Sequence, residues 1–313
     1  MLRALKYTKN FIRQISPFHS NSSITHASLR QEYLLAKSLL QVQTKEHYMD
    51  LLADLKLRAG HDIDHQRGFL ITKSNDISRL EAVTDYCRQA WPKEYIEKTV
   101  SKPSKNDTLL SVHLDLQDPR NKIVKDFILS AEIIATAARY LEEIPILFGA
   151  YVWYCPNRAA KDMVGSQMYH CDREDYRQLK IFIPIDEITP NCGPTTCVDA
   201  KATKLFFTHL SKQGSTTSLK NRFTDDEVHT YASRDEQAIV GKPGTLGFVD
   251  TTNCLHYGSR PARHGKYHIV LHFVTPFSYK LRDKIKSNEL NGALEDIVFC
   301  YRSESNHIRK PIN

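Results

Sequence analysis

The segment SQMYHCDRED, residues 166–175, places His170 and Asp172 two positions apart. On a strand or a strand edge, side chains two positions apart point to the same face, so both could reach one metal ion. Two histidines and one carboxylate leave coordination positions open, which is the arrangement used for non-haem Fe(II) chemistry with oxygen. A later strand must then supply the second histidine. The candidate is His256, which follows a strand-like segment in GFVDTTNCLHYGSRP.

The His-x-Asp pattern alone carries little information, because the chain has 14 histidines and 36 acidic residues. The same pattern occurs in HDIDH, residues 61–65, which follows a predicted helix. We interpret that segment as a solvated polar loop. His170 differs because it lies where the strand-rich part of the chain begins.

The first 143 residues have a mostly helical pattern. Apolar residues recur at helical spacing over residues 28–58, ahead of Gly60, over 76–91, ahead of Pro92, and over 121–143. Between the last two lies a polar loop, EKTVSKPSKNDT. We therefore expect a helical region at 28–143.

From residue 144 onward, short segments rich in β-branched and aromatic residues predict strands at 144–155, 179–188, 193–198, 244–252 and 266–277. Successive strands of this kind indicate a sandwich or barrel. Residues 200–240 form a long insertion with a capping-box helix start at Thr224 and Glu227, and its length favours a lid or binding loop. We expect one α+β domain, residues 28–313, with its β core at about 145–276 and a C-terminal extension at 277–313.

Two segments, SQMYHCDREDYRQLKIFIPIDEITPNCGPTT and GKPGTLGFVDTTNCLHYGSRPARHGKYHIVLHFVTP, together resemble the phytanoyl-CoA dioxygenase-like family of Fe(II)/2-oxoglutarate oxygenases. The family's parts come in the same order: a glutamine, His-x-Asp, an apolar strand, a Gly-Pro turn, a distal histidine and a basic residue on the last strand. The resemblance implies a double-stranded β-helix, the jelly-roll barrel shared with cupins, with iron at one mouth.

Carried over residue by residue, the resemblance makes His170, Asp172 and His256 the iron ligands and the catalytic centre. Fe(II) would act with 2-oxoglutarate and O2 as co-substrates, and decarboxylation to succinate would drive hydroxylation of an unactivated C–H bond. Related halogenases carry a small residue in place of the carboxylate, which lets chloride bind. Asp172 therefore favours hydroxylation.

The co-substrate residues depart from the family pattern. The family arginine about ten residues after the distal histidine is replaced by Lys266, which keeps the positive charge but loses the bidentate fork. His268 shares a strand face with Lys266 and either adds a hydrogen bond to the co-substrate or is a half-buried barrel histidine. Further candidates beside the co-substrate or the iron are Gln167 and Tyr154. Arg260 and Arg263 are nearby substitutes for Lys266, and Lys180 is expected to face solvent.

The formal charge of +7 does not indicate a nucleic-acid partner. Five basic and no acidic residues lie in the first 31, so the rest of the chain has 38 basic against 36 acidic side chains, a net +2. No basic cluster interleaved with aromatic residues suggests a nucleotide groove. Seven cysteines, never spaced Cys-x-x-Cys, indicate reduced thiols in a cytosol-like compartment. The expected substrate is a small organic molecule or a lipid-linked one.

Residues 1–27 form a basic N-terminal segment. Wound as a helix, residues 1–18 place apolar side chains on one side and Arg3, Lys6, Lys9 and Arg13 on the other. Three interpretations stay open: a helix that lies on an anionic membrane surface, a mitochondrial targeting sequence if the source is eukaryotic, or a helix packed against its own domain.

Two other functions also remain open. The chain could be a cupin-like metal-binding protein without catalysis, which the change to Lys266 allows. It could instead hold zinc for hydrolysis, because two histidines and a carboxylate also form catalytic zinc sites.

Overall fold

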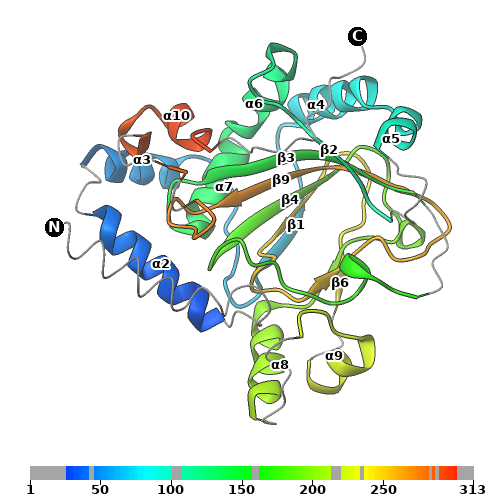
Figure 1. Cartoon of the computed structure of the whole chain (residues 1–313). Coiled ribbons are helices and arrows are strands. Elements are labelled where there is room, and N and C mark those ends of the chain that lie inside the picture. The colour runs from blue at the N-terminus through cyan, green and yellow to red at the C-terminus, as the bar shows by residue number, and fades with distance from the viewer. Residues whose placement is uncertain are drawn as a thin grey trace.

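The computed structural model describes residues 26–41, 46–100, 108–156, 162–212, 220–232, 236–281, 284–285 and 289–301. Figure 1 shows a β core with helices along one side and a helical insertion at one end. The amphipathic helix expected at residues 1–18 lies outside the described residues. Of the helices described, none is both long and apolar enough to cross a membrane.

The larger sheet has six strands, all paired antiparallel, in the order β1-β7-β4-β9-β3-β2. From edge to edge these are β1 (Phe69–Lys73), β7 (Thr245–Val249), β4 (Gln178–Pro184), β9 (Lys266–Val274), β3 (Ile146–Cys155) and β2 (Leu110–His113).

The smaller sheet has the order β6-β5-β8, with β6 (Gln237–Ala238), β5 (Thr196–Cys197) and β8 (His256–Tyr257). Two further antiparallel bridges widen it, from His170 to His256 and from Tyr169 to Phe223. An apolar cluster with members from both sheets, including Phe182, Cys197 and Val270, lies between them. Two facing antiparallel sheets connected in this order form the double-stranded β-helix, so the predicted fold class is confirmed.

Alternation along β9 sorts its side chains between two environments, although all nine residues are buried. Tyr267, Ile269, Leu271 and Phe273 join the main hydrophobic core against the helices. Lys266, His268, Val270 and His272 therefore point the other way, between the two sheets. Three polar side chains, Lys266, His268 and His272, thus lie on the inner face of a strand whose residues are all buried.

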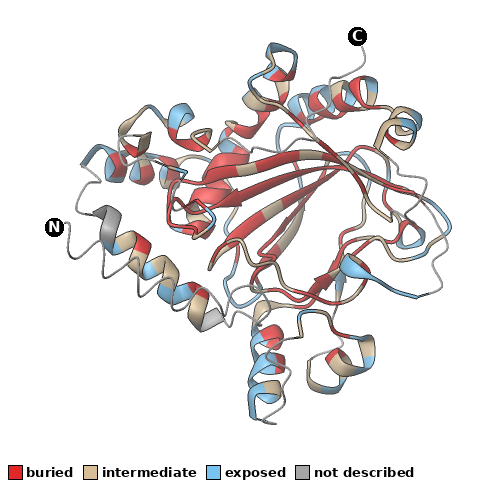
Figure 2. Ribbon diagram, viewed as in Figure 1, coloured by how far each residue is buried: buried red, intermediate tan, exposed pale blue. Residues whose placement is uncertain are grey.

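Helices cover the outer face of the larger sheet (Figures 1 and 2). They include α3 (Glu46–Leu57), α4 (Ile77–Ala90), α6 (Lys122–Ile128) and α7 (Ala131–Leu141), and their apolar faces belong to the same core as the outward side chains of β3 and β9. On α7 nine of the 11 residues are buried, which is why this helix appears almost wholly red in Figure 2.

The expected helices are present. The pattern over 28–58 covers α2 (His26–Gln41) and α3, with residues 42–45 outside the described ranges. The pattern over 121–143 is divided into α6 and α7 at Leu129 and Ser130, where Ser130 adopts an extended backbone immediately before α7. The helix expected at 76–91 is α4, and its N-terminus is capped by the Asp76 side chain, which accepts a hydrogen bond from the Arg79 amide.

Among the α-helices and strands of the N-terminal region, three were not expected. The strands β1 and β2 fall inside the region interpreted as helical, and α5 (Lys93–Val100) overlaps the segment interpreted as a polar loop. Both strands are short edge strands whose positions depend on pairing with β7 and β3, so their own sequences signal them weakly. The described part of the C-terminal extension contains the 3-10 turn Glu289–Asn291 and α10 (Leu294–Val298).

The insertion at 200–240 carries α8 (Ala200–Lys212) and α9 (Asp225–Tyr231). The expected capping box is present: the Glu227 amide donates to Thr224 Oγ1, and the Thr224 amide donates 2.8 Å to a Glu227 carboxylate oxygen. Side chains of the insertion, among them Phe206 and Phe223, form a separate apolar cluster with Tyr169. The insertion therefore packs against the segment that carries His170.

Candidate metal centre

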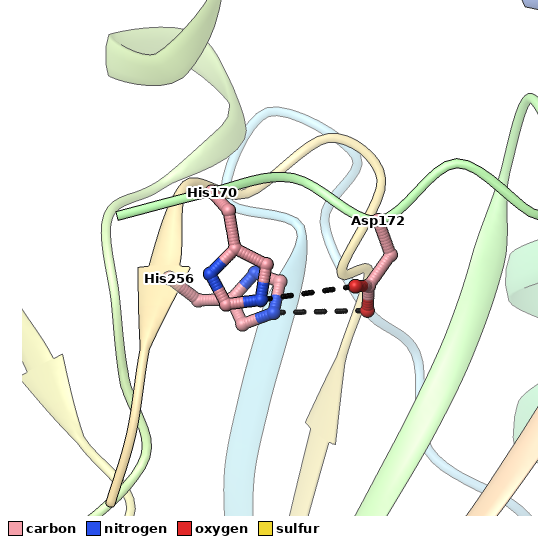
Figure 3. Close-up of side chains that lie close together, drawn as sticks. All are labelled: His170, Asp172 and His256. Atoms are coloured by element: carbon pink, nitrogen blue, oxygen red, sulfur yellow. Dashed lines mark ion pairs between the residues drawn. The ribbon is translucent and has the colours of Figure 1, made fainter. Parts of the chain in front are cut away.

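His170 and His256 lie opposite each other on neighbouring extended segments. Their backbones exchange two hydrogen bonds, 3.0 Å from the His170 amide to the His256 carbonyl and 2.9 Å in the other direction. Side chains of directly opposed residues project from the same face of a sheet. The two rings accordingly lie with their centroids 4.2 Å apart (Figure 3).

Asp172 completes a compact group with the two histidines. Its amide donates 2.8 Å to the carbonyl of Thr251, which fixes the backbone two residues beyond His170. The carboxylate oxygens lie 3.8 Å from Nε2 of His170 and 3.7 Å from Nε2 of His256 (Figure 3). One ligand atom from each of the three residues lies within 4.8 Å of the others. The structure thus brings together the three residues predicted to hold a metal ion.

Backbone contacts fix which nitrogen of each histidine faces the carboxylate. Nδ1 of His170 lies 2.9 Å from the Met168 carbonyl, and Nδ1 of His256 lies 3.0 Å from the Cys254 carbonyl. A carbonyl only accepts, so each Nδ1 carries the proton and each Nε2 presents a lone pair. Metal-binding histidines are commonly oriented in this way by a partner on the second ring nitrogen.

The charges of the group suit a cation. Burial lowers the pKa of His170 to about 3 and also lowers that of His256, so both rings stay neutral at physiological pH. Burial alone would raise the pKa of Asp172, but the ammonium of Lys180 beside it holds that pKa well below its usual range. Two neutral nitrogens and one carboxylate are therefore ready to bind metal without releasing protons.

Lys180 was expected to face solvent, but it does not. It lies on β4, and its Nζ donates 2.7 Å to Oδ2 of Asp172 while only 13% of its side chain is exposed. On the inner face of the larger sheet Lys180 is paired in register with His272 of β9. The expectation failed because the inward register of β4 depends on its partners, which the sequence of one strand does not fix.

Lys266 and His268 both lie between the sheets. Lys266 is 3% exposed, its Nζ donates 3.1 Å to Thr195 Oγ1, and no carboxylate among the described residues pairs with it. A Cβ on Gly258, two residues after His256, would lie 3.3 Å from that Nζ, so the glycine lets the Lys266 ammonium approach this segment closely. Both ring nitrogens of the buried His268 lack a hydrogen-bond partner in the described part of the chain.

One other candidate, Tyr154, does not face the space between the sheets. Tyr154 packs edge-on against Tyr267 on the outer, helix-covered face, with ring centroids 6.2 Å apart. The inner position on β3 belongs instead to its neighbour Trp153, whose ring meets His268 at 5.7 Å. Tyr154 is therefore not placed to contact a co-substrate, because strand alternation turns it outward.

Gln167 is fully buried, but its amide is committed to the local backbone. Oε1 accepts 3.0 Å from the Val164 amide, and Nε2 donates 2.8 Å to the Ser259 carbonyl. This ties the turn before His170 to the segment after His256, a positioning contact rather than the co-substrate contact expected. Arg260, one alternative to Lys266, is occupied by a two-pronged ion pair with Asp225, and Arg263 is exposed.

Sequence interpretation missed two inward-facing residues, His272 and Thr195. His272 is buried, its Nε2 has no hydrogen-bond partner among the described residues, and the alternation that links Lys266 to His268 continues to it. Thr195 follows the Gly-Pro turn directly and meets Lys266. His272 could have been found by extending the alternation from Lys266 and His268, whereas the contact of Thr195 with Lys266 joins segments far apart in the chain.

No protein-family model matches the sequence, and no curated protein matches it either. Solved structures with similar folds include EctD from S. alaskensis with 2-oxoglutarate and 5-hydroxyectoine, at 14% identity over 67% of this chain and 73% of that chain, with a TM-score of 0.45. AviO1 from Streptomyces viridochromogenes Tue57 matches at 15% identity over 68% and 92%, with a TM-score of 0.44. HygX from Streptomyces hygroscopicus with nickel and 2-oxoglutarate matches at 11% over 74% and 88%, also at 0.44. Since every one of these TM-scores is below 0.5, the interpretation of the site rests on its own side chains.

Proposed function

We propose that the protein is an Fe(II)/2-oxoglutarate-dependent dioxygenase that hydroxylates an unactivated C–H bond of a small-molecule or lipid-linked substrate. The observation that carries the proposal is the buried group of His170, Asp172 and His256. Fe(II) bound there would let 2-oxoglutarate and O2 react to give succinate, CO2 and a hydroxylated substrate.

The two histidine nitrogens and the carboxylate would bind Fe(II) and leave some of its coordination positions open. Both Nε2 atoms and the carboxylate converge, and no fourth His, Cys, Asp or Glu joins this group in the described residues. A structural zinc site would use four protein ligands in a closed tetrahedron. Three protein ligands leave room for the co-substrate and for oxygen, as hydroxylation requires.

The buried lysine between the sheets also suits a dicarboxylic co-substrate. Lys266 is a buried ammonium whose only partner in the described chain is a neutral hydroxyl, Thr195. An isolated buried charge is costly, so a carboxylate is the natural partner for it. Gly258 beside Lys266 lies two strand residues from His256, about 7 Å along the chain. A five-carbon dicarboxylate held at the metal centre could place its far carboxylate there.

We further propose the phytanoyl-CoA dioxygenase-like family as the specific group. Its support is the order of motifs from Gln167 to Lys266, with lysine in place of the family arginine. Asp172 occupies the carboxylate position, which supports hydroxylation rather than halogenation. The basic segment at residues 1–18 supports a lipid-linked substrate at a membrane, or a location in an organelle.

Succinate formation tests the proposal. The protein, loaded with Fe(II) without oxygen, is mixed with 2-oxoglutarate and O2, and succinate is quantified with and without a panel of organic substrates. We expect Fe(II)-dependent succinate that is lost in His170→Ala and kept in the matched control His65→Ala, whose exposed side chain belongs to the HDIDH segment. Firm binding of Fe(II) with no turnover would favour a non-catalytic metal protein. Zinc-dependent hydrolysis that needs no oxygen would establish the zinc hydrolase.

A further inference from the structure

Arg222 lies beside His170 on the edge of the smaller sheet. Tyr169 and Phe223 form an antiparallel bridge, with backbone hydrogen bonds of 3.1 and 2.9 Å. In an antiparallel pair, the residue after Tyr169 faces the residue before Phe223, so Arg222 is opposite His170. Opposed side chains share a face, and Tyr169 and Phe223 share the other one, in the insertion's apolar cluster. Arg222, His170 and His256 therefore form one row on the metal-binding face.

Among the described residues, Arg222 is held by neutral groups only. Its Nε donates 2.9 Å to the Gly165 carbonyl and its Nη1 donates 2.8 Å to the Asn221 carbonyl. Within the described part of the chain no ion pair involves Arg222, whereas Arg260 on the neighbouring loop is paired with Asp225. A guanidinium has five N–H donors, so these contacts position the group and leave donors to spare.

The positive charge of Arg222 is not balanced by the metal site. Asp172 supplies one negative charge, and Lys180 already balances it. Lys266, the proposed anchor of the co-substrate, lies beside Gly258 and Thr195, and no contact joins it to Arg222 in the described chain. Arg222 is thus a half-buried cation at the metal-binding face without an acidic partner among the described residues.

We propose that Arg222 binds an anionic group, a carboxylate or a phosphate, on the substrate that is oxidised at the metal centre. The planar fork of arginine matches both groups and holds either one in a fixed orientation. Arg222 belongs to the 200–240 insertion, so the insertion selects anionic substrates and orients them toward the metal. This inference rests on the proposed oxygenase function.

Matched anionic and neutral probes test the inference. The protein is loaded with Co(II) in place of iron, saturated with 2-oxoglutarate without oxygen, and titrated with butanoate against butanamide, octanoate against octanamide, and hexyl phosphate against hexanol. Changes in the Co(II) absorption spectrum report binding near the metal. We expect the anion of at least one pair to bind roughly tenfold more tightly than its neutral partner. The pair that shows this preference distinguishes a carboxylate from a phosphate substrate.

Variants separate recognition from folding. In Arg222→Gln the preference for the anion should disappear while the neutral probe binds as before, and Arg222→Lys should keep part of it. The control is Arg120→Gln, whose arginine pairs with Asp118 outside the metal centre and should leave the preference intact. A purely structural role for Arg222 would change both members of a pair together.

Three results would overturn the inference: no anion preference in any pair, a preference that survives Arg222→Gln, or a loss of 2-oxoglutarate affinity in that variant, which would assign Arg222 to the co-substrate. Failure of the oxygenase proposal looks different. In that case the unaltered protein would not bind Co(II) at the histidines or would not bind 2-oxoglutarate, before any probe is added.

Discussion

Lys180 donates a hydrogen bond of 2.7 Å to Asp172, so the carboxylate of the metal centre carries its own counter-charge. Both side chains are largely buried, at 13% and 15% exposed. Removing one partner of such a pair leaves a charge buried alone and is strongly destabilising. We expect Lys180→Met to lower the free energy of unfolding of the metal-free protein by about 3 kcal/mol.

Excess Co(II) should restore most of that stability, because the metal ion then balances Asp172. Urea unfolding with EDTA and with Co(II) measures both effects. The control Lys122→Met breaks an exposed pair with Asp126 and should change stability by less than about 1 kcal/mol. An unchanged metal-free stability in Lys180→Met would show that Asp172 does not depend on Lys180.

Single alanine variants of His170, Asp172 and His256 should each weaken metal binding. Each removes one of three ligand atoms that lie within 4.8 Å of one another, so an affinity loss of roughly a hundredfold is expected. Isothermal titration with Co(II) gives the dissociation constants. His65→Ala is the matched control, because it removes a histidine of the same sequence pattern that lies in an exposed loop. Equal affinities in all four variants would place the metal elsewhere.

Lys266→Met should weaken 2-oxoglutarate binding while leaving the metal affinity unchanged. The ammonium is the charged partner proposed for the far carboxylate, and a charge-assisted hydrogen bond of this kind supports a loss of roughly tenfold or more. Titration of the Co(II)-loaded protein with 2-oxoglutarate measures the change. The control is Lys242→Met, on the exposed turn before β7. Unaltered 2-oxoglutarate affinity in Lys266→Met would remove Lys266 from the co-substrate site.

The buried histidines should make the metal-free protein less stable as the pH falls. Burial, with Lys266 adding to it, holds the pKa of His268 well below its usual value near 6.5. Below pH 6.5 the unfolded chain takes up a proton at this position and the folded chain does not, so the free energy of unfolding decreases as pH decreases. Asp175 acts in the opposite sense, because burial raises its pKa to about 7.

A single variant isolates the contribution of His268. His268→Phe should reduce the slope of unfolding free energy against pH by about 1 kcal/mol per pH unit between pH 5 and 6. Urea unfolding at several pH values in EDTA gives the slope. A slope equal to that of the unaltered protein would mean that His268 is protonated in the folded state.

The metal-binding residues could be predicted because each of the two segments that carry them has a local sequence pattern. His170 and Asp172 show strand spacing, and His256 follows a strand that a simple pattern reveals. The residues around them depend on which way each strand faces, and that is set by pairing between distant segments. Lys180 was therefore placed outward and Tyr154 inward, both wrongly, and Arg222 was missed because its partner segment at Tyr169 lies more than fifty residues away.

The fold could be predicted to a similar degree. The core strands can be predicted from their β-branched and aromatic residues, as in KYHIVLHFV of β9. The edge strands β1 and β2 do not, because a strand of four or five residues gains its stability from its neighbour. The break between α6 and α7 at Ser130 was hidden by continuous apolar spacing across it.

A crystal structure of the protein with Fe(II) and 2-oxoglutarate, prepared without oxygen, tests the central claim most directly. The account predicts one iron ion bound by Nε2 of His170, Nε2 of His256 and the carboxylate of Asp172, with 2-oxoglutarate on the ion and its far carboxylate on Nζ of Lys266. Iron bound away from these three side chains, or 2-oxoglutarate absent from the cavity at saturating concentration, would contradict it.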